Sequence, residues 1–180
     1  TDKVLEFINE NSKPKITEKK ESGEVFTPMT LVNEMLDTLP KTVWNNSNLK
    51  WLDPAAGMGN FPVAIFMRLM KGLKEVIKDE ELRRKHILEK MLYMVELDKK
   101  NVFMMKKIFC GNKYKLNITL GSFIDFKHFN KVDLVLKFDI ILGNPPFQYK
   151  EIQNTKSHTI WHLFVERSYK ELSKDKGYLL

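Results

Sequence analysis

Cysteine is almost absent from this sequence, and so are long apolar runs. The 180 residues include one cysteine, Cys110, so no disulfide can form within the chain. That composition fits a reducing compartment, and we expect a cytoplasmic protein. No apolar run approaches the roughly 20 residues that cross a bilayer. The N-terminal residues TDKVLEFINENSKPK are too charged for a signal peptide, so we expect no membrane partner.

Metal-ligating patterns are also lacking. His158 and His162 are four residues apart, but no glutamate completes the HExxH pattern of a zinc site. We therefore predict no metal and interpret both histidines as surface or packing residues of a helix. Acidic residues are outnumbered, 23 against 30 lysines and arginines, for a formal charge of +7. A basic chain favours polyanions, of which nucleic acid is the commonest large one.

Apolar periodicity along the chain alternates between strands and helices. Strands are predicted at 49–54, 91–97, 116–120 and 138–142, with a fifth beginning at Tyr178. Helices are predicted at 61–73, 79–90, 99–109 and along the apolar stripe from Ile160 to Leu172. A further helix is expected to open at Thr27-Pro28, with threonine as cap, proline in the first turn and Leu31 on its buried side.

This alternation predicts an α/β fold, a mostly parallel sheet with helices on both faces. We expect a linker or helix at 1–22 and one domain at 23–180, incomplete at its C-terminus because the sequence ends in a strand. The carboxyl ends of parallel strands meet at one edge, where ligands bind. Four polar residues lie at the ends of predicted strands there: Asp53, Glu96, Ser122 and Asn144.

A glycine loop joins the first strand to a helix, with the sequence Asp53-Pro54-Ala55-Ala56-Gly57-Met58-Gly59-Asn60. Gly57 and Gly59 allow a sharp turn and the close approach of a ligand. The loop lacks the lysine of a P-loop, which argues against a nucleoside triphosphate. Asp53 would repel a pyrophosphate but suits a ligand with an amino group beside a carboxylate. The methionine end of S-adenosyl-L-methionine has both. Glu96, after the next strand, is suited to accept hydrogen bonds from two ribose hydroxyls.

Asn144-Pro145-Pro146-Phe147 is the most specific motif of the sequence. Two prolines remove two backbone donors and stiffen the turn. The Pro145 carbonyl and the Asn144 side-chain oxygen can then act as two fixed acceptors for an NH2 group on a planar ring. Holding both hydrogens frees the nitrogen lone pair for attack on a sulfonium methyl, chiefly by position and electrostatics. Phe147 offers a flat face on which a flipped base can stack.

With these motifs in place, residues 23 to 180 resemble the gamma-type N6-adenine DNA methyltransferases of restriction–modification systems, the branch of type I modification subunits and fused type II enzymes. The resemblance implies a Rossmann-like S-adenosylmethionine-dependent fold with a site-specific N6-adenine activity. It also implies cofactor contacts, which in chain order are Phe26, Thr27, Pro28, Asp53, Pro54, Ala55, Gly57, Gly59, Asn60, Phe61, Glu96, Leu97, Ser122 and Phe123. Asn144 to Phe147 correspond to the catalytic tetrapeptide.

Ser122 departs from the family pattern. Relatives usually have an aspartate there to bind the cofactor's adenine amine, and a serine oxygen accepts that hydrogen bond more weakly. Phe123 fits either a place against that adenine or the ordinary core.

The partners implied are double-stranded DNA and a target-recognition domain or subunit. Two alternatives stay open: methylation of an RNA base or of protein glutamine, and a cofactor-binding remnant that contacts DNA without catalysis.

Overall fold

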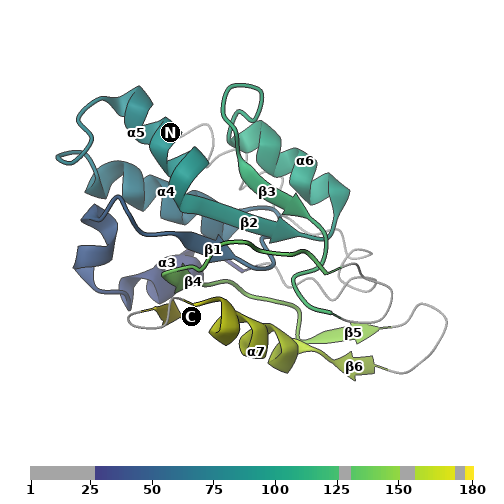
Figure 1. The fold of residues 1–180 in the computed structure, drawn as a ribbon. Coiled ribbons are helices and arrows are strands. Elements are labelled where there is room, and N and C mark those ends of the chain that lie inside the picture. The colour runs from purple at the N-terminus through teal and green to yellow at the C-terminus, as the bar shows by residue number, and fades with distance from the viewer. Residues whose placement is uncertain (1–26, 126–130, 151–156, 173–176) are drawn as a thin grey trace.

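A five-stranded parallel sheet forms the centre of the molecule (Figure 1). The computed structural model describes residues 27–125, 131–150, 157–172 and 177–180. The order of the strands is β3-β2-β1-β4-β7. Their bounds are β1 Trp51–Asp53, β2 Leu92–Glu96, β3 Asn117–Leu120, β4 Ile140–Ile141 and β7 Tyr178–Leu179. All four pairings are parallel, which confirms the predicted α/β fold.

The predicted helices form between these strands. Their bounds are α3 Met29–Asp37, α4 Asn60–Gly72, α5 Glu80–His86, α6 Lys99–Ile108 and α7 Trp161–Glu171, with a 3-10 turn at Lys41–Asn45 and a π-helical turn at Ile87–Met91. Asp98 caps α6 by accepting a hydrogen bond from the Lys100 amide at 2.7 Å.

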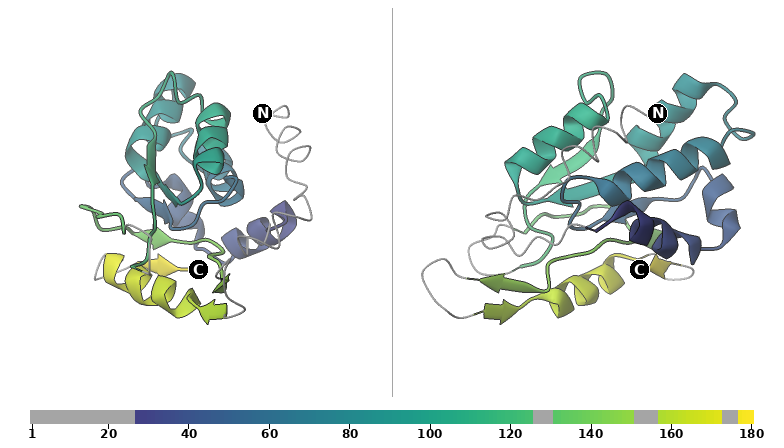
Figure 2. Two further views of the ribbon diagram at one scale, coloured as in Figure 1. Left: turned by 90° about the vertical axis from the view of Figure 1, so that its right-hand side faces the viewer. Right: turned by 180° about the vertical axis from the view of Figure 1, so that it is seen from behind.

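Neighbouring residues of each strand pack into two separate cores, because side chains alternate between the faces of a sheet. Trp51, Met94 and Ile140 pack with α3, α4 and α6, in the larger cluster. Leu52 and Ile141 pack with α7, in the smaller one. Figure 2 shows, from behind, α3 and α4 in front of the strands, with α7 along the β4 and β7 side.

The start of α3 differs from the prediction. Pro28 itself is the N-cap, in extended conformation, and no side chain caps the helix. Thr27 lies one residue before the cap, and its hydroxyl oxygen accepts a hydrogen bond from Asn144. Leu31 is 46% exposed rather than buried, while Val32 and Leu36 are fully buried. The apolar stripe is therefore narrower than the sequence suggested.

A two-stranded hairpin stands where the sequence indicated only a loop and a helix. β5 (Gln148–Lys150) follows Phe147 at once and pairs antiparallel with β6 (Ser157–Thr159). His158 lies on β6 opposite Tyr149, so it does not share a helix face with His162 as predicted. Each strand has three residues, too few for apolar alternation to be recognised in the sequence.

Cys110, the single cysteine of the sequence, follows α6 and is exposed, with a positive φ of 52°. Within the described ranges, no helix is long and apolar enough to cross a membrane. The predicted linker at 1–22 lies outside the described residues, as does Phe26.

Candidate active site

The predicted site residues gather at the carboxyl edge of the sheet. Asp53 ends β1, Glu96 ends β2, Ser122 comes two residues after β3, and Asn144 comes three residues after β4. Backbone hydrogen bonds hold the adjoining loops together: the Ala56 amide donates to the Val95 carbonyl at 3.0 Å, and the Leu142 amide to the Leu52 carbonyl at 3.0 Å. The glycine loop and the Asn-Pro-Pro-Phe turn are therefore neighbours.

The glycine loop uses two left-handed residues, Gly57 at φ 54° and Gly59 at φ 95°. A side chain at Gly57 would meet no atom within 4 Å, so the backbone there faces open space. At Gly59, a Cβ would lie 3.1 Å from the Met105 side chain, so this glycine allows close packing against α6. The sequence predicted that both glycines allow a ligand to approach closely, but only Gly57 leaves room for one.

Asp53 is 1% exposed. Its Oδ1 accepts a hydrogen bond from the Ala55 amide at 3.1 Å, and its Oδ2 is buried without a hydrogen-bond partner among the described residues. Burial raises the pKa of this carboxyl from 3.8 to about 8; the Ala55 amide opposes the rise and the charge of Glu96 adds to it. A buried carboxyl with one oxygen lacking a hydrogen-bond partner is costly, and pairing of its carboxylate form with a cationic ligand group would offset that cost.

Glu96 joins β2 to the glycine loop. Its Oε2 accepts from the Gly57 amide and its Oε1 from the Asp98 amide, both at 2.7 Å. The Glu96 carboxylate therefore fixes the glycine loop against the end of β2. Leu97, next in the chain, is 47% exposed at the same edge.

Ser122 and Phe123 are both buried, with 6% and 1% of their surface exposed. The Ser122 hydroxyl donates to the Ile124 carbonyl at 2.7 Å and accepts from the Ile124 amide at 3.2 Å, so it bonds within its own loop. Phe123 is 1% exposed and stacks on Phe164 with 5.9 Å between ring centroids. The Arg167 guanidinium lies 4.6 Å from the Phe123 ring centroid. Phe123 therefore packs as an ordinary core residue in this structure, rather than against an open site for the cofactor adenine.

The turn after β4 lies directly against Asp53. A Cβ at Gly143 would come 2.7 Å from Asp53 Oδ1, a distance that requires glycine at this position. The next residue, Asn144, is half-buried and donates from Nδ2 to Thr27 Oγ1 at 3.0 Å. Phe147 is 58% exposed, and its carbonyl accepts from the Ile160 amide at 3.0 Å.

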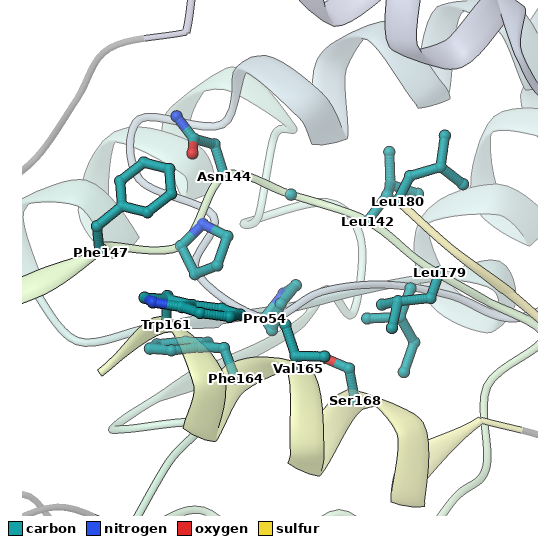
Figure 3. A pocket seen from close by; sticks show the side chains of 13 residues that line it. Pro54, Leu142, Asn144, Phe147, Trp161, Phe164, Val165, Ser168, Leu179 and Leu180 are labelled. Carbon is teal, nitrogen blue, oxygen red and sulfur yellow. The ribbon is translucent and has the colours of Figure 1, made fainter. Parts of the chain in front are cut away.

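A pocket of about 240 Å³ underlies this turn, between β4, β7 and α7 (Figure 3). Figure 3 shows Trp161 and Phe164 on the α7 side, while the Asn144 side chain points away from that helix. The pocket lining includes Pro54 of the glycine loop together with Pro145 and Phe147 of the turn. Asn144 also lines this pocket, although its side chain points away from α7.

Two contributors to the site were missed by the sequence interpretation. Gly143 was not singled out, although it determines how closely the turn approaches Asp53. The contact between Thr27 and Asn144 joins residues 117 positions apart, and no local pattern can indicate it. In the described part of the chain, no three histidine, cysteine, aspartate or glutamate side chains form a group that could hold a metal ion.

Solved structures share this architecture at low sequence identity. The type I restriction enzyme EcoKI M protein is 17% identical with a TM-score of 0.57, covering 83% of this chain and 32% of its own. A modification subunit of a putative type I restriction enzyme from Vibrio vulnificus is 20% identical with a TM-score of 0.56, covering 98% of this chain and 35% of its own. The fold is the Rossmann-like fold of S-adenosylmethionine-dependent methyltransferases.

The sequence comparison is more specific than the fold. The profile of the Eco57I restriction-modification methylase family matches residues 63–180, and the chain belongs to that family. A protein of Mycoplasma pneumoniae named as an adenine-specific methylase is 27% identical over 92% of this chain and 56% of its own length. The chain thus spans about half the length of this curated relative, and about a third of the two modification subunits.

Proposed function

We propose that this chain carries the catalytic centre of an S-adenosylmethionine-dependent DNA methyltransferase that modifies N6 of adenine. The observation that carries the proposal is the position of Asn144. Its amide stands on a proline-stiffened turn that lies against buried Asp53, at the same sheet edge as the glycine loop. Membership of the restriction-modification methylase family and the name of the Mycoplasma relative support the same activity.

The residues at the edge fit the proposed cofactor. Asp53 Oδ2 is a buried acceptor without a described partner, which suits the amino group of the methionine part. Gly57 adjoins open space, and Glu96, which binds the Gly57 amide at the end of β2, is proposed to accept from the ribose hydroxyls. S-adenosylmethionine supplies an electrophilic methyl group on a sulfonium. We propose that residues 23–180 form its binding domain, with Pro28, Pro54, Ala55, Asn60 and Phe61 completing the cofactor contacts.

Asn144 and the Pro145 carbonyl are proposed to hold the substrate amine. Both offer oxygen acceptors, and accepting its two hydrogens orients the nitrogen lone pair toward the methyl group. No strong base is required, because the product amine loses its extra proton readily. Pro146 keeps the turn rigid, and the exposed face of Phe147 stacks on the target base once it leaves the duplex.

Double-stranded DNA is the proposed partner, in keeping with the formal charge of +7. Sequence choice is assigned to a target-recognition domain or subunit, since the described part of the chain is occupied by the sheet and its covering helices.

Methyl transfer by the full-length protein tests this function. Labelled S-adenosylmethionine is supplied with duplex DNA, RNA or protein extract, and the methylated product is identified by mass spectrometry. N6-methyladenine in DNA is expected. Asn144→Ala is expected to abolish transfer while calorimetry still detects cofactor binding. Label in RNA or in glutamine instead would overturn the DNA assignment, and activity surviving in Asn144→Ala would overturn the catalytic one.

A further inference from the structure

Thr27 connects the glycine-loop helix to the proposed catalytic asparagine. The Asn60 side chain, at the first residue of α4, donates from Nδ2 to the Thr27 carbonyl at 2.9 Å. The Asn144 side chain donates from Nδ2 to the Thr27 hydroxyl oxygen at 3.0 Å. Thr27 and Asn60 are 7% and 6% exposed. One buried threonine therefore contacts both halves of the site through separate atoms.

The direction of the hydrogen bond at Asn144 matters chemically. An asparagine amide has donors on one side and an acceptor on the other, and its terminal torsion is broad and roughly two-fold. When Nδ2 donates to Thr27, Oδ1 is directed elsewhere and is free to accept. The opposite orientation would present NH2 to the NH2 of a substrate, placing two donors face to face. A threonine hydroxyl can also donate, so Thr27 holds the amide in place, and the structure shows it in the productive orientation, with Nδ2 as the donor.

Thr27 is well suited to fix that acceptor in place. Its β-branched side chain has few rotamers. Pro28 follows it and restricts its backbone to extended conformations. Its carbonyl is held by Asn60, whose own position is set by the start of α4. The hydroxyl oxygen therefore has little freedom to move away from Asn144.

We propose that Thr27 is a positioning residue, whose hydroxyl orients the Asn144 amide so that Oδ1 faces the substrate amine. This inference rests on the proposed function. It differs from the role that family resemblance implies for Thr27, which is to hold the methionine part of the cofactor. The two roles predict changes in different quantities. Loss of orientation lowers kcat at saturating cofactor, whereas loss of a cofactor contact raises the cofactor Kd.

Three variants of the full-length protein separate these roles. Thr27→Val keeps the shape and removes the hydroxyl, whereas Thr27→Ser keeps the hydroxyl. Thr38→Val makes the same change at an exposed threonine that ends α3, whose hydroxyl donates to the Met35 carbonyl at 2.7 Å. We expect Thr27→Val to lower kcat roughly 10- to 100-fold, in line with a lost orienting hydrogen bond. We expect Thr27→Ser to restore most of the rate, Thr38→Val to resemble wild type, and cofactor Kd to change less than about two-fold.

A second measurement reads the contact without catalysis. NMR signals of the Asn144 side-chain amide hydrogens are assigned by their loss in Asn144→Ala. These hydrogens should exchange with solvent more slowly in the wild type than in Thr27→Val. An unchanged kcat in Thr27→Val, or a raised Kd at unchanged kcat, overturns the inference. If wild type transfers no methyl group but this protection depends on the Thr27 hydroxyl, the proposed function fails while the positioning contact stands. If the protection is the same in Thr27→Val, the positioning contact fails as well.

Discussion

Gly143 and Asp53 lie so close that a single added methyl group cannot fit between them. A Cβ at Gly143 would be 2.7 Å from Asp53 Oδ1 and 3.3 Å from Pro54 Cδ. Asp53 cannot move aside easily, because it ends a buried strand and accepts from the Ala55 amide. This contact couples the Asn-Pro-Pro-Phe turn to the loop that is proposed to hold the cofactor.

Gly143→Ala is therefore expected to destabilise the protein by about 1–3 kcal/mol and to displace Asn144. Urea unfolding measures the stability, and methyl transfer measures the displacement, with an expected drop in kcat of roughly ten-fold or more. A double-mutant cycle with Asp53→Ala identifies the cause. Gly143→Ala should cost clearly less when the carboxyl is already gone; equal costs in both backgrounds would place the strain elsewhere.

Asp53 should make stability depend on pH in an unusual direction. An unfolded aspartate ionises near pH 4, whereas in the fold the pKa of Asp53 is about 8. Between these values the native state binds one more proton than the unfolded state, so its stability falls as pH rises. The expected loss from this group is about 1 kcal/mol per pH unit between pH 5 and 8, levelling off above pH 8.

Asp53→Asn removes this ionisation and should remove that part of the slope. Unfolding in urea at pH 5, 6.5 and 8 compares the variant with the wild type and with Asp133→Asn, a change at an exposed aspartate. The advantage of Asp53→Asn over wild type should grow with pH. Parallel curves for all three proteins would show that Asp53 ionises normally in the fold.

Cofactor binding should release a proton if the amino group of S-adenosylmethionine pairs with Asp53. A nearby cation favours the carboxylate, so below pH 8 the carboxyl must lose its proton on binding. Affinity should then rise with pH up to about 8. Calorimetry at pH 6.5, in buffers of different ionisation enthalpy, counts the released protons. Release should be present in the wild type and reduced in Asp53→Asn; tight binding without release in the wild type would contradict the pairing.

Local patterns were sufficient to predict the sheet and both loops of the site. The buried strands around Trp51 and Ile140 are apolar runs, and the glycine and proline loops that follow them have composition signals of their own. The carboxyl-edge arrangement then follows from parallel pairing alone. These features required no knowledge of contacts between distant parts of the chain.

Other features depended on tertiary contacts and could not be predicted. Thr27 resembles a helix cap in sequence, but its hydroxyl oxygen accepts from a residue 117 positions away. Leu31 fits the apolar stripe of α3 but is 46% exposed, whereas Val32 and Leu36 are fully buried and Met35 packs against the core. Cys110, just after the end of α6, is exposed in a left-handed conformation that the sequence does not indicate. In each case, the structure depends on a contact or turn that the local pattern of apolar residues does not predict.

Phe147 offers a test of base stacking with a closely matched control. It is 58% exposed, and Phe103 on α6 is 57% exposed, so truncating either ring should change stability little. Only Phe147 follows the proposed catalytic turn. Phe103 instead lies under the Lys107 ammonium, 4.5 Å from its ring centroid.

Phe147→Ala is expected to lower kcat/KM for duplex DNA roughly 10- to 100-fold, because stacking contributes about 1–3 kcal/mol per base. Cofactor Kd should be unchanged, since the ring is proposed to contact the base alone. With 2-aminopurine at the target position, the fluorescence increase on binding reports a flipped base, and restacking in the variant should diminish it. Phe103→Ala should behave as wild type in all three measurements. A wild-type rate in Phe147→Ala would mean that the target base is held by other residues.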